Sequence, residues 1–184
     1  PVSIDTFRSS MAARVIHKYG KVIINDISAG ELDPLIVDVA AEHDVPYVAM
    51  HMKGNPRTML SMTDYRDIVA EVVDYFRERT AQLRERGVRR IVVDPGFGFA
   101  KTLEQNYELL RGLHRLAELG YPVLAGVSRK SMIYKLLGTT PAEALNGTTA
   151  LHWECLRQGA VILRAHDTRE AVEVVRMFDQ FMQA

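Results

Sequence analysis

Six short apolar runs, each followed by a longer segment with helical spacing, constrain the fold of this chain more than any other feature. The runs are rich in β-branched residues and lie at residues 2–4, 22–24, 47–49, 91–93, 123–125 and 161–163. They are too uniformly apolar to face water on one side, which is typical of parallel strands covered by helices. We therefore predict an α/β fold of six consecutive strand–helix units.

An open doubly wound sheet and a closed (β/α)8 barrel both repeat such a unit. The chain has 184 residues, so each unit takes about 31 residues and eight would take about 245, close to the roughly 250 of a typical barrel. No glycine-rich phosphate loop follows the first strand, which disfavours a dinucleotide-binding open sheet, although six open strands would also fit the length. We expect one domain over residues 1–184, a TIM (β/α)8 barrel lacking two units.

Composition narrows the class of protein. The chain is 47% hydrophobic and carries 23 basic and 23 acidic residues, so it has no excess of positive charge for binding nucleic acid. No apolar run approaches the roughly 18 residues of a membrane helix. The single cysteine, Cys155, fits a reducing compartment, and no signal peptide opens the sequence. We expect a cytoplasmic protein without nucleic-acid or membrane partners.

Polar side chains gather directly after the strands. In parallel α/β folds the carboxyl ends of the strands form the ligand-binding face. One polar residue there usually caps the next helix, but six such clusters are hard to explain by capping alone. The clusters are Asp5 and Thr6, Asn25 and Asp26, Met50 to Met52, Asp94 to Gly96, Gly126 with Ser128 to Ser131, and Arg164 to Asp167.

Asp94 ends the fourth apolar run and leads into a glycine-rich turn at residues 95–101. A carboxylate at the floor of a pocket can accept parallel hydrogen bonds from a planar heterocycle. Phe99 would supply an apolar wall, and the glycines would let backbone approach a flat ligand. The alternative is a turn that Asp94 merely caps. Asp5 and Asn25 would complete a set that reads the ligand edge, although each alone is more often structural.

Two clusters near the C-terminus suit an anion. Ser128 and Lys130 lie where a strand meets a helix, and the free N–H groups of a helix start bind anions; plain helix capping is the alternative. Arg164 and His166 leave the last strand on the same side, because strand residues two apart share a face. The guanidinium fork of arginine suits phosphate, whereas His166 could instead cap the last helix.

Several other residues are interpreted as structural. His51 has no cysteine or carboxylate at a ligand spacing, so packing is favoured over a zinc site. Cys155 is expected in the core, and Trp153 fits either barrel packing or a subunit contact. Thr102 with Gln105 predicts a helix capping box, and Asp167 with Glu170 a looser one.

Taken in order, six motifs resemble dihydropteroate synthase, most closely its bacterial forms. They are Val2–Thr6, Ile23–Ile27, Met50–Pro56, Asp94–Phe99, Ser128–Ser131 and Arg164–Asp167. The resemblance implies a transferase of folate biosynthesis with a (β/α)8 barrel fold. Its reaction condenses para-aminobenzoate with 6-hydroxymethyl-7,8-dihydropterin pyrophosphate to give 7,8-dihydropteroate and pyrophosphate, assisted by Mg²⁺. It further implies a homodimer, with residues 142–158 as a candidate contact, and a target of sulfonamides.

Carried over by position, the resemblance implies a role for each strand-end cluster. Phe99 and Ser128 would bind para-aminobenzoate, and Arg164 with His166 would hold the pyrophosphate. The residues implied for pterin binding are Asp5, Asn25, Met50, Asp94, Gly126, Lys130 and Arg164. Those implied for catalysis are Asp94, Lys130, Arg164 and His166.

Two departures from the family pattern accompany the resemblance. Ala165 stands where a bulkier aliphatic residue is more usual. The first two units of the family are absent, and with them its flexible loops and the asparagine that binds Mg²⁺. We therefore expect no metal ligand among residues 1–184, and we expect these residues to be part of a longer protein. The alternatives are a pterin-dependent methyltransferase, which needs no pyrophosphate site, and a noncatalytic pterin-binding fragment.

Overall fold

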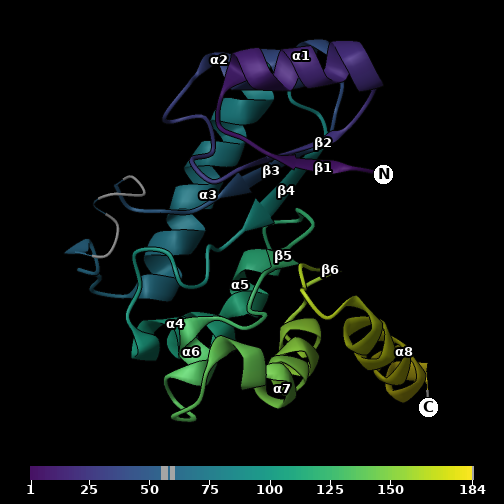
Figure 1. The fold of residues 1–184 in the computed structure, drawn as a ribbon. Coiled ribbons are helices and arrows are strands. Elements are labelled where there is room, and N and C mark those ends of the chain that lie inside the picture. Colours follow the sequence, from purple (N-terminus) through teal and green to yellow (C-terminus); the bar gives the residue numbers. More distant parts are fainter. Residues whose placement is uncertain (55–57, 59–60, 184) are drawn as a thin grey trace.

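The computed structural model, which describes residues 1–54, 58 and 61–183, contains the predicted alternation of parallel strands and helices (Figure 1). The strands follow each other in chain order, with β1–β2–β3–β4 in one sheet and β5–β6 in a second. A parallel bridge from Val93 to Val123 joins the two sheets. The strands are β1 (Ser3–Asp5), β2 (Ile23–Asp26), β3 (Tyr47–Met50), β4 (Ile91–Asp94), β5 (Leu124–Ala125) and β6 (Ile162–Leu163).

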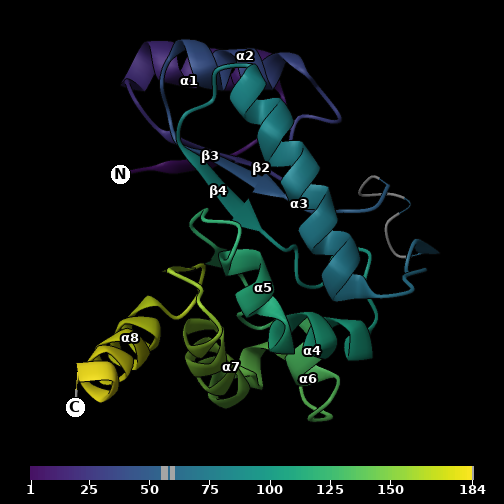
Figure 2. The same cartoon turned by 180° about the vertical axis from the view of Figure 1, so that it is seen from behind.

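Every strand is followed by at least one helix. The helices are α1 (Ser9–Tyr19), α2 (Leu35–Glu42), α3 (Ile68–Glu85), α4 (Leu103–Arg111), α5 (Leu113–Ala117), α6 (Ser131–Tyr134), the 3₁₀ helix η2 (Pro141–Glu143), α7 (Leu145–Arg157) and α8 (Thr168–Gln183). Seen from behind, α3 runs along the sheet of β2 to β4, with α5 below it (Figure 2). Within the described residues, none of the helices is both long enough and apolar enough to cross a membrane.

The core lies between the strands and the helices that cover them. Phe76 on α3 is fully buried, as are Tyr47 on β3 and Phe97 after β4. Cys155 on α7 is buried too, as predicted, and its burial raises the pKa of the thiol to about 12. A rigid core behind the strands fixes where each strand ends, so it also positions the polar residues that follow.

Helix caps agree with the sequence in one case and differ in another. Thr102 and Gln105 form the predicted capping box at the start of α4, each side chain bonding the other residue's backbone N–H. The carboxylate of Asp167, predicted to cap the last helix, binds the guanidinium of Arg129 at 2.6 and 2.8 Å. This contact joins the loop after β5 to the loop after β6.

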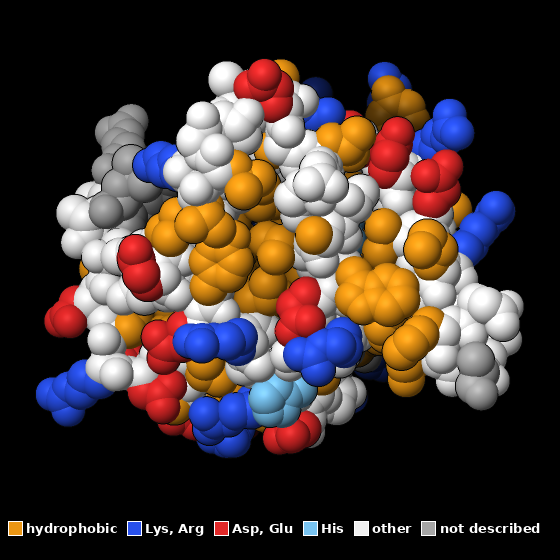
Figure 3. All heavy atoms as spheres, turned by 90° about the horizontal axis from the view of Figure 1, so that it is seen from below, with side chains coloured by type: hydrophobic (Ala, Val, Ile, Leu, Met, Phe, Trp, Pro, Cys, Tyr) orange, Lys and Arg blue, Asp and Glu red, His pale blue; other side chains and the backbone are white. Residues whose placement is uncertain are grey.

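A partly apolar surface lies on α7 and α8. Trp153 packs edge-on against Phe178 and Phe181, with ring centroids 5.3 and 5.6 Å apart. Phe181 and Met177 are about two-thirds exposed, at 66% each. From below, this end of the molecule shows hydrophobic side chains interspersed with charged ones (Figure 3).

Asp26 organises the loop after β2. Its buried carboxylate accepts hydrogen bonds from the backbone N–H groups of Ser28 and Gly30 at 2.8 and 2.7 Å. It also accepts from the Tyr47 hydroxyl at 2.6 Å. A buried carboxylate is costly without such donors, so Tyr47 stabilises the strand end that also carries Asn25.

Replacing Tyr47 by phenylalanine tests this role. Tyr47→Phe leaves the ring in the core but removes one donor to a buried carboxylate, so we expect unfolding free energy to fall by about 1–3 kcal/mol. Urea denaturation measures the change. Tyr19→Phe is the matched control, because Tyr19 is 69% exposed; equal stability of the two variants would contradict the prediction.

Candidate active site

The carboxyl ends of four strands meet around the guanidinium of Arg164. Its Nη2 lies 2.8 Å from Asp94 Oδ2, an ion pair between the ends of β6 and β4. Its Nη1 donates to Asn25 Oδ1 at 3.2 Å, and the Asn25 amide in turn donates to Asp5 Oδ1 at 2.6 Å. The predicted convergence of these residues is therefore present in the structure.

Asp94 combines the two interpretations that the sequence left open. The residue is fully buried, and its Oδ1 accepts from the backbone N–H of Gly96 at 2.8 Å, as a turn cap does. Oδ2 faces Arg164 at ion-pair distance but receives no aligned hydrogen bond from the described residues. One oxygen thus shapes the turn while the other keeps acceptor capacity for a ligand.

Two glycines permit close approaches around this carboxylate. A Cβ on Gly126 would lie 2.7 Å from Arg164 Nη2, so a side chain there would push the guanidinium from its place at the end of β5. Gly96 has φ +69°, and a Cβ there would lie 2.1 Å from the His51 carbonyl oxygen. It would also lie 3.3 Å from Met50 Cγ, which places the buried Met50 side chain beneath this turn.

Lys130 enters the site at the start of α6. Its Nζ donates to the Phe97 carbonyl and lies 4.9 Å from the centroid of the Phe99 ring, a favourable cation–π distance. Burial lowers the pKa of Lys130 to about 8, although the nearby Asp94 carboxylate opposes the shift. An anion bound nearby would therefore stabilise the protonated form of Lys130.

Ser128 and His166 contact each other through hydrogen bonds, a contact that was not predicted from the sequence. The Ser128 hydroxyl accepts from the His166 backbone N–H at 3.1 Å and lies 3.0 Å from His166 Nδ1. Together with the ion pair between Arg129 and Asp167, this contact ties the loop after β5 to the loop after β6. The residues of both loops that the sequence analysis assigned to an anion are therefore held as one unit.

A cavity of about 260 Å³ opens onto these groups. Four predicted residues do not line it: Asn25 and Asp94 contact Arg164, Met50 packs near Gly96, and Phe99 lies beside Lys130. The lining residues are Asp5, Gly126, Ser128, Lys130, Arg164, Ala165 and His166. Six of these seven were predicted; Ala165 was noted only as a departure from the family pattern.

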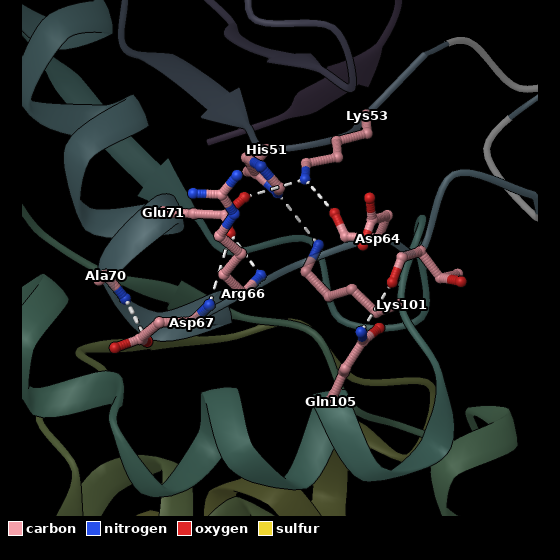
Figure 4. A network of polar contacts seen from close by, with 10 residues as sticks. His51, Lys53, Asp64, Arg66, Asp67, Ala70, Glu71, Lys101 and Gln105 are labelled. Carbon is pink, nitrogen blue, oxygen red and sulfur yellow. Dashed lines mark hydrogen bonds and ion pairs between the residues drawn. The ribbon is translucent and has the colours of Figure 1, made fainter.

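Lys101 lies next to the site, and no role was predicted for it. Its buried Nζ donates to the carbonyls of Phe99 and Gly96 at 2.9 and 3.1 Å and lies 3.1 Å from His51 Nδ1 (Figure 4). Burial lowers the pKa of Lys101 to about 7 and holds the pKa of His51 well below its usual range. A lysine directly after a glycine-rich turn, where carbonyls need donors, is the signal that could have revealed it.

His51 itself packs as predicted. Its ring meets Tyr75 edge-on, with centroids 4.9 Å apart. Within the described residues, no three His, Cys, Asp or Glu side chains gather so that they could hold a metal ion. The described residues therefore do not by themselves offer a set of protein ligands for Mg²⁺.

Comparisons with known proteins agree with this geometry. The family model described as pterin binding enzyme matches residues 1–166. The chain is 42% identical over 182 residues to dihydropteroate synthase from Synechocystis sp., an alignment that covers 97% of this chain. The chain spans only 63% of the length of that relative.

Solved structures show the same likeness in three dimensions. Dihydropteroate synthase from Thermus thermophilus in complex with 6HMPPP matches with a TM-score of 0.92 and 40% identity, over 98% of this chain and 72% of the other. The same enzyme in complex with 4-aminobenzoate matches with a TM-score of 0.93 and 39% identity, over 98% and 74%. The predicted fold class is confirmed: the chain is α/β, and its parallel strands cover part of a (β/α)8 barrel.

The lowered pKa of Lys130 predicts how stability depends on pH. Below about pH 8 the lysine is charged in both the folded and the unfolded chain, so its effect on stability is constant. Between about pH 8 and its usual pKa of 10.5 the unfolded chain binds more protons, so stability rises with pH. The rise should be less than about 1.4 kcal/mol per pH unit, because the side chain is partly exposed.

Lys130→Met is the variant that isolates this effect. The difference in unfolding free energy between wild type and Lys130→Met, measured in urea at about pH 7.5 and 9.5, should shift in favour of wild type at the higher pH. A difference that stays constant across this interval would show that burial does not perturb Lys130.

Proposed function

This chain belongs to the family of pterin-binding enzymes, and from that premise we propose that its protein is a dihydropteroate synthase. In the proposed reaction, the bond between the pterin methylene carbon and the pyrophosphate oxygen breaks. A bond forms between that carbon and the amine nitrogen of para-aminobenzoate, which loses a proton to solvent. The observation that carries the proposal is the contact of Arg164 with Asp94, which sets an anion-binding fork beside a buried acceptor.

The pterin is assigned to the floor of the site. Asp94 Oδ2 is buried and free to accept from N–H groups on the edge of a flat heterocycle. Asn25 offers an amide with both donor and acceptor atoms, and Asp5 adds an acceptor at the cavity wall. Within this domain of residues 1–184, Met50 and Gly126 would line the slot, and Lys130 would bond the ring.

The pyrophosphate is assigned to Arg164 and His166, which both line the cavity. The leaving group takes negative charge with it, so fixed donors at this position stabilise the charge that develops in the transition state. The carbon left behind gains cationic character, which the pterin ring bound by Asp94 can spread. Lys130 adds a nearby positive charge whose protonation a bound anion favours.

The aminobenzoate is assigned to Phe99 and Ser128. Because Ser128 Oγ already accepts from the His166 N–H, its own proton can go either to His166 Nδ1 or to the carboxylate of the ligand. The aromatic amine is a weak nucleophile, and no side chain in the cavity stands out as a dedicated general base. Positioning of the two substrates therefore carries much of the acceleration.

The remaining features implied by the resemblance belong to the same proposal. They are assistance by Mg²⁺, a cytoplasmic location, sensitivity to sulfonamides that mimic para-aminobenzoate, and a homodimer that contacts through residues 142–158. The exposed side chains of Met177 and Phe181 beside Trp153 support an interface at this surface, because contiguous apolar patches mark protein contacts.

The complete protein should form 7,8-dihydropteroate from the two substrates, with release of pyrophosphate. Chromatography of the product and a pyrophosphate assay measure this directly. Pterin bound without product formation would favour a noncatalytic pterin-binding protein, and methyl transfer from a pterin donor would favour the methyltransferase. Either result would overturn the proposed reaction.

Arg164→Ala tests the assignment of the pyrophosphate. Hydrogen bonds to charged groups contribute about 1.5–3 kcal/mol each, so calorimetry should show pyrophosphate binding weakened at least roughly tenfold. Binding of the free pterin should remain detectable. Arg115→Ala, at an exposed position on α5, is the matched control, and unchanged pyrophosphate affinity in Arg164→Ala would contradict the assignment.

A further inference from the structure

The turn that follows β4 has an unusual backbone. Gly96 and Gly98 have φ of +69° and +80°, and Ala100, which has a side chain, has φ of +51°. Left-handed conformations at every second residue prevent the regular hydrogen bonds of a helix or a strand. The Gly96 carbonyl accepts from the Phe99 N–H within the turn, but no described backbone N–H donates to the Phe99 carbonyl, so side-chain donors are needed.

Lys101 supplies those donors from beneath the turn. Its ammonium donates to the Phe99 carbonyl at 2.9 Å, and no other described residue donates to that oxygen. It also donates to the Gly96 carbonyl at 3.1 Å and lies 3.1 Å from His51 Nδ1 at the end of β3. In Figure 4 the side chain of Lys101 points toward His51.

The same turn carries the groups that meet Lys130. The Phe97 carbonyl accepts from the Lys130 ammonium, and the Phe99 ring lies 4.9 Å from it. Lys101 does not line the cavity, and its hydrogen bonds to the carbonyls of Phe99 and Gly96 connect it to the site through the turn. Asp94 and Asn25, in contrast, lie on strands, although one Asp94 oxygen also accepts from the Gly96 N–H of this turn.

We propose that Lys101 is a positioning residue that holds the Phe99 wall against Lys130 and thereby sets the affinity for the aminobenzoate substrate. This inference rests on the proposed function, in which Phe99 contacts para-aminobenzoate. The pterin is bound chiefly by strand residues, so its affinity should depend much less on Lys101. The two substrates therefore distinguish positioning of the wall from a general loss of structure.

Lys101→Met keeps the aliphatic stem and removes the ammonium. In the complete protein we expect the KM for para-aminobenzoate to rise about tenfold, since small displacements of a positioning group cost up to about a hundredfold. The KM for the pterin pyrophosphate should change less than about twofold. The Phe99 amide should exchange with deuterium faster in the variant without substrates. Lys18→Met, at an exposed position on α1, should match wild type in all three measurements.

The outcomes separate this inference from the proposed function. A wild-type protein that makes no dihydropteroate would overturn the function, while the exchange of the Phe99 amide would still test whether Lys101 holds the turn. Unchanged exchange, an unchanged KM for para-aminobenzoate, or an equal rise in both KM values would overturn the role of Lys101. If Lys101→Met does not fold, Lys101→Ala, which also lacks a side-chain donor, takes its place with the same criteria.

Discussion

The ion pair between Arg164 and Asp94 is the contact on which the site depends. Asp94 is fully buried, and a buried carboxylate is costly unless charge and hydrogen bonds compensate it. Arg164 supplies the charge from β6, and its second nitrogen reaches Asn25 on β2. The Arg164 side chain thus links the end of the last strand, β6, to the ends of β4 and β2, which belong to the other sheet.

The other residues of the site lie either on strand ends or on loops, and different contacts hold each group in place. The acceptors assigned to the pterin sit on strand ends that the hydrophobic core holds. The groups assigned to the anion sit on two loops, which the bidentate pair of Arg129 and Asp167 and the contact of Ser128 with His166 join. The Phe99 wall sits on a third loop, which Lys101 supports from below. Rigid strands and separately anchored loops allow one ligand to be bound firmly while its reaction partner is positioned independently.

Much of the site was predictable because strand ends in a parallel fold share one face. Asp5, Asn25, Asp94, Lys130 and Arg164 were each predicted from a polar residue after an apolar run, and the structure brings them together. Contacts between loops were not predictable in this way. Nothing in the local sequence of Ser128 shows that its hydroxyl meets His166, and Asp167 has the same local features whether it caps a helix or binds Arg129.

The sequence by itself determined the strand–helix alternation, the order of the units and the set of side chains at the strand ends. Hydrophobic periodicity, and polar residues that directly follow apolar runs, are local properties of the sequence. Only the tertiary structure decided which of those side chains touch. It alone shows that one oxygen of Asp94 caps a turn while the other faces a guanidinium. It also shows that Lys101, an ordinary lysine in the sequence, lies buried beneath the turn. The physical reason is that burial and pairing of charges depend on segments distant in the chain, which meet only when the strands assemble.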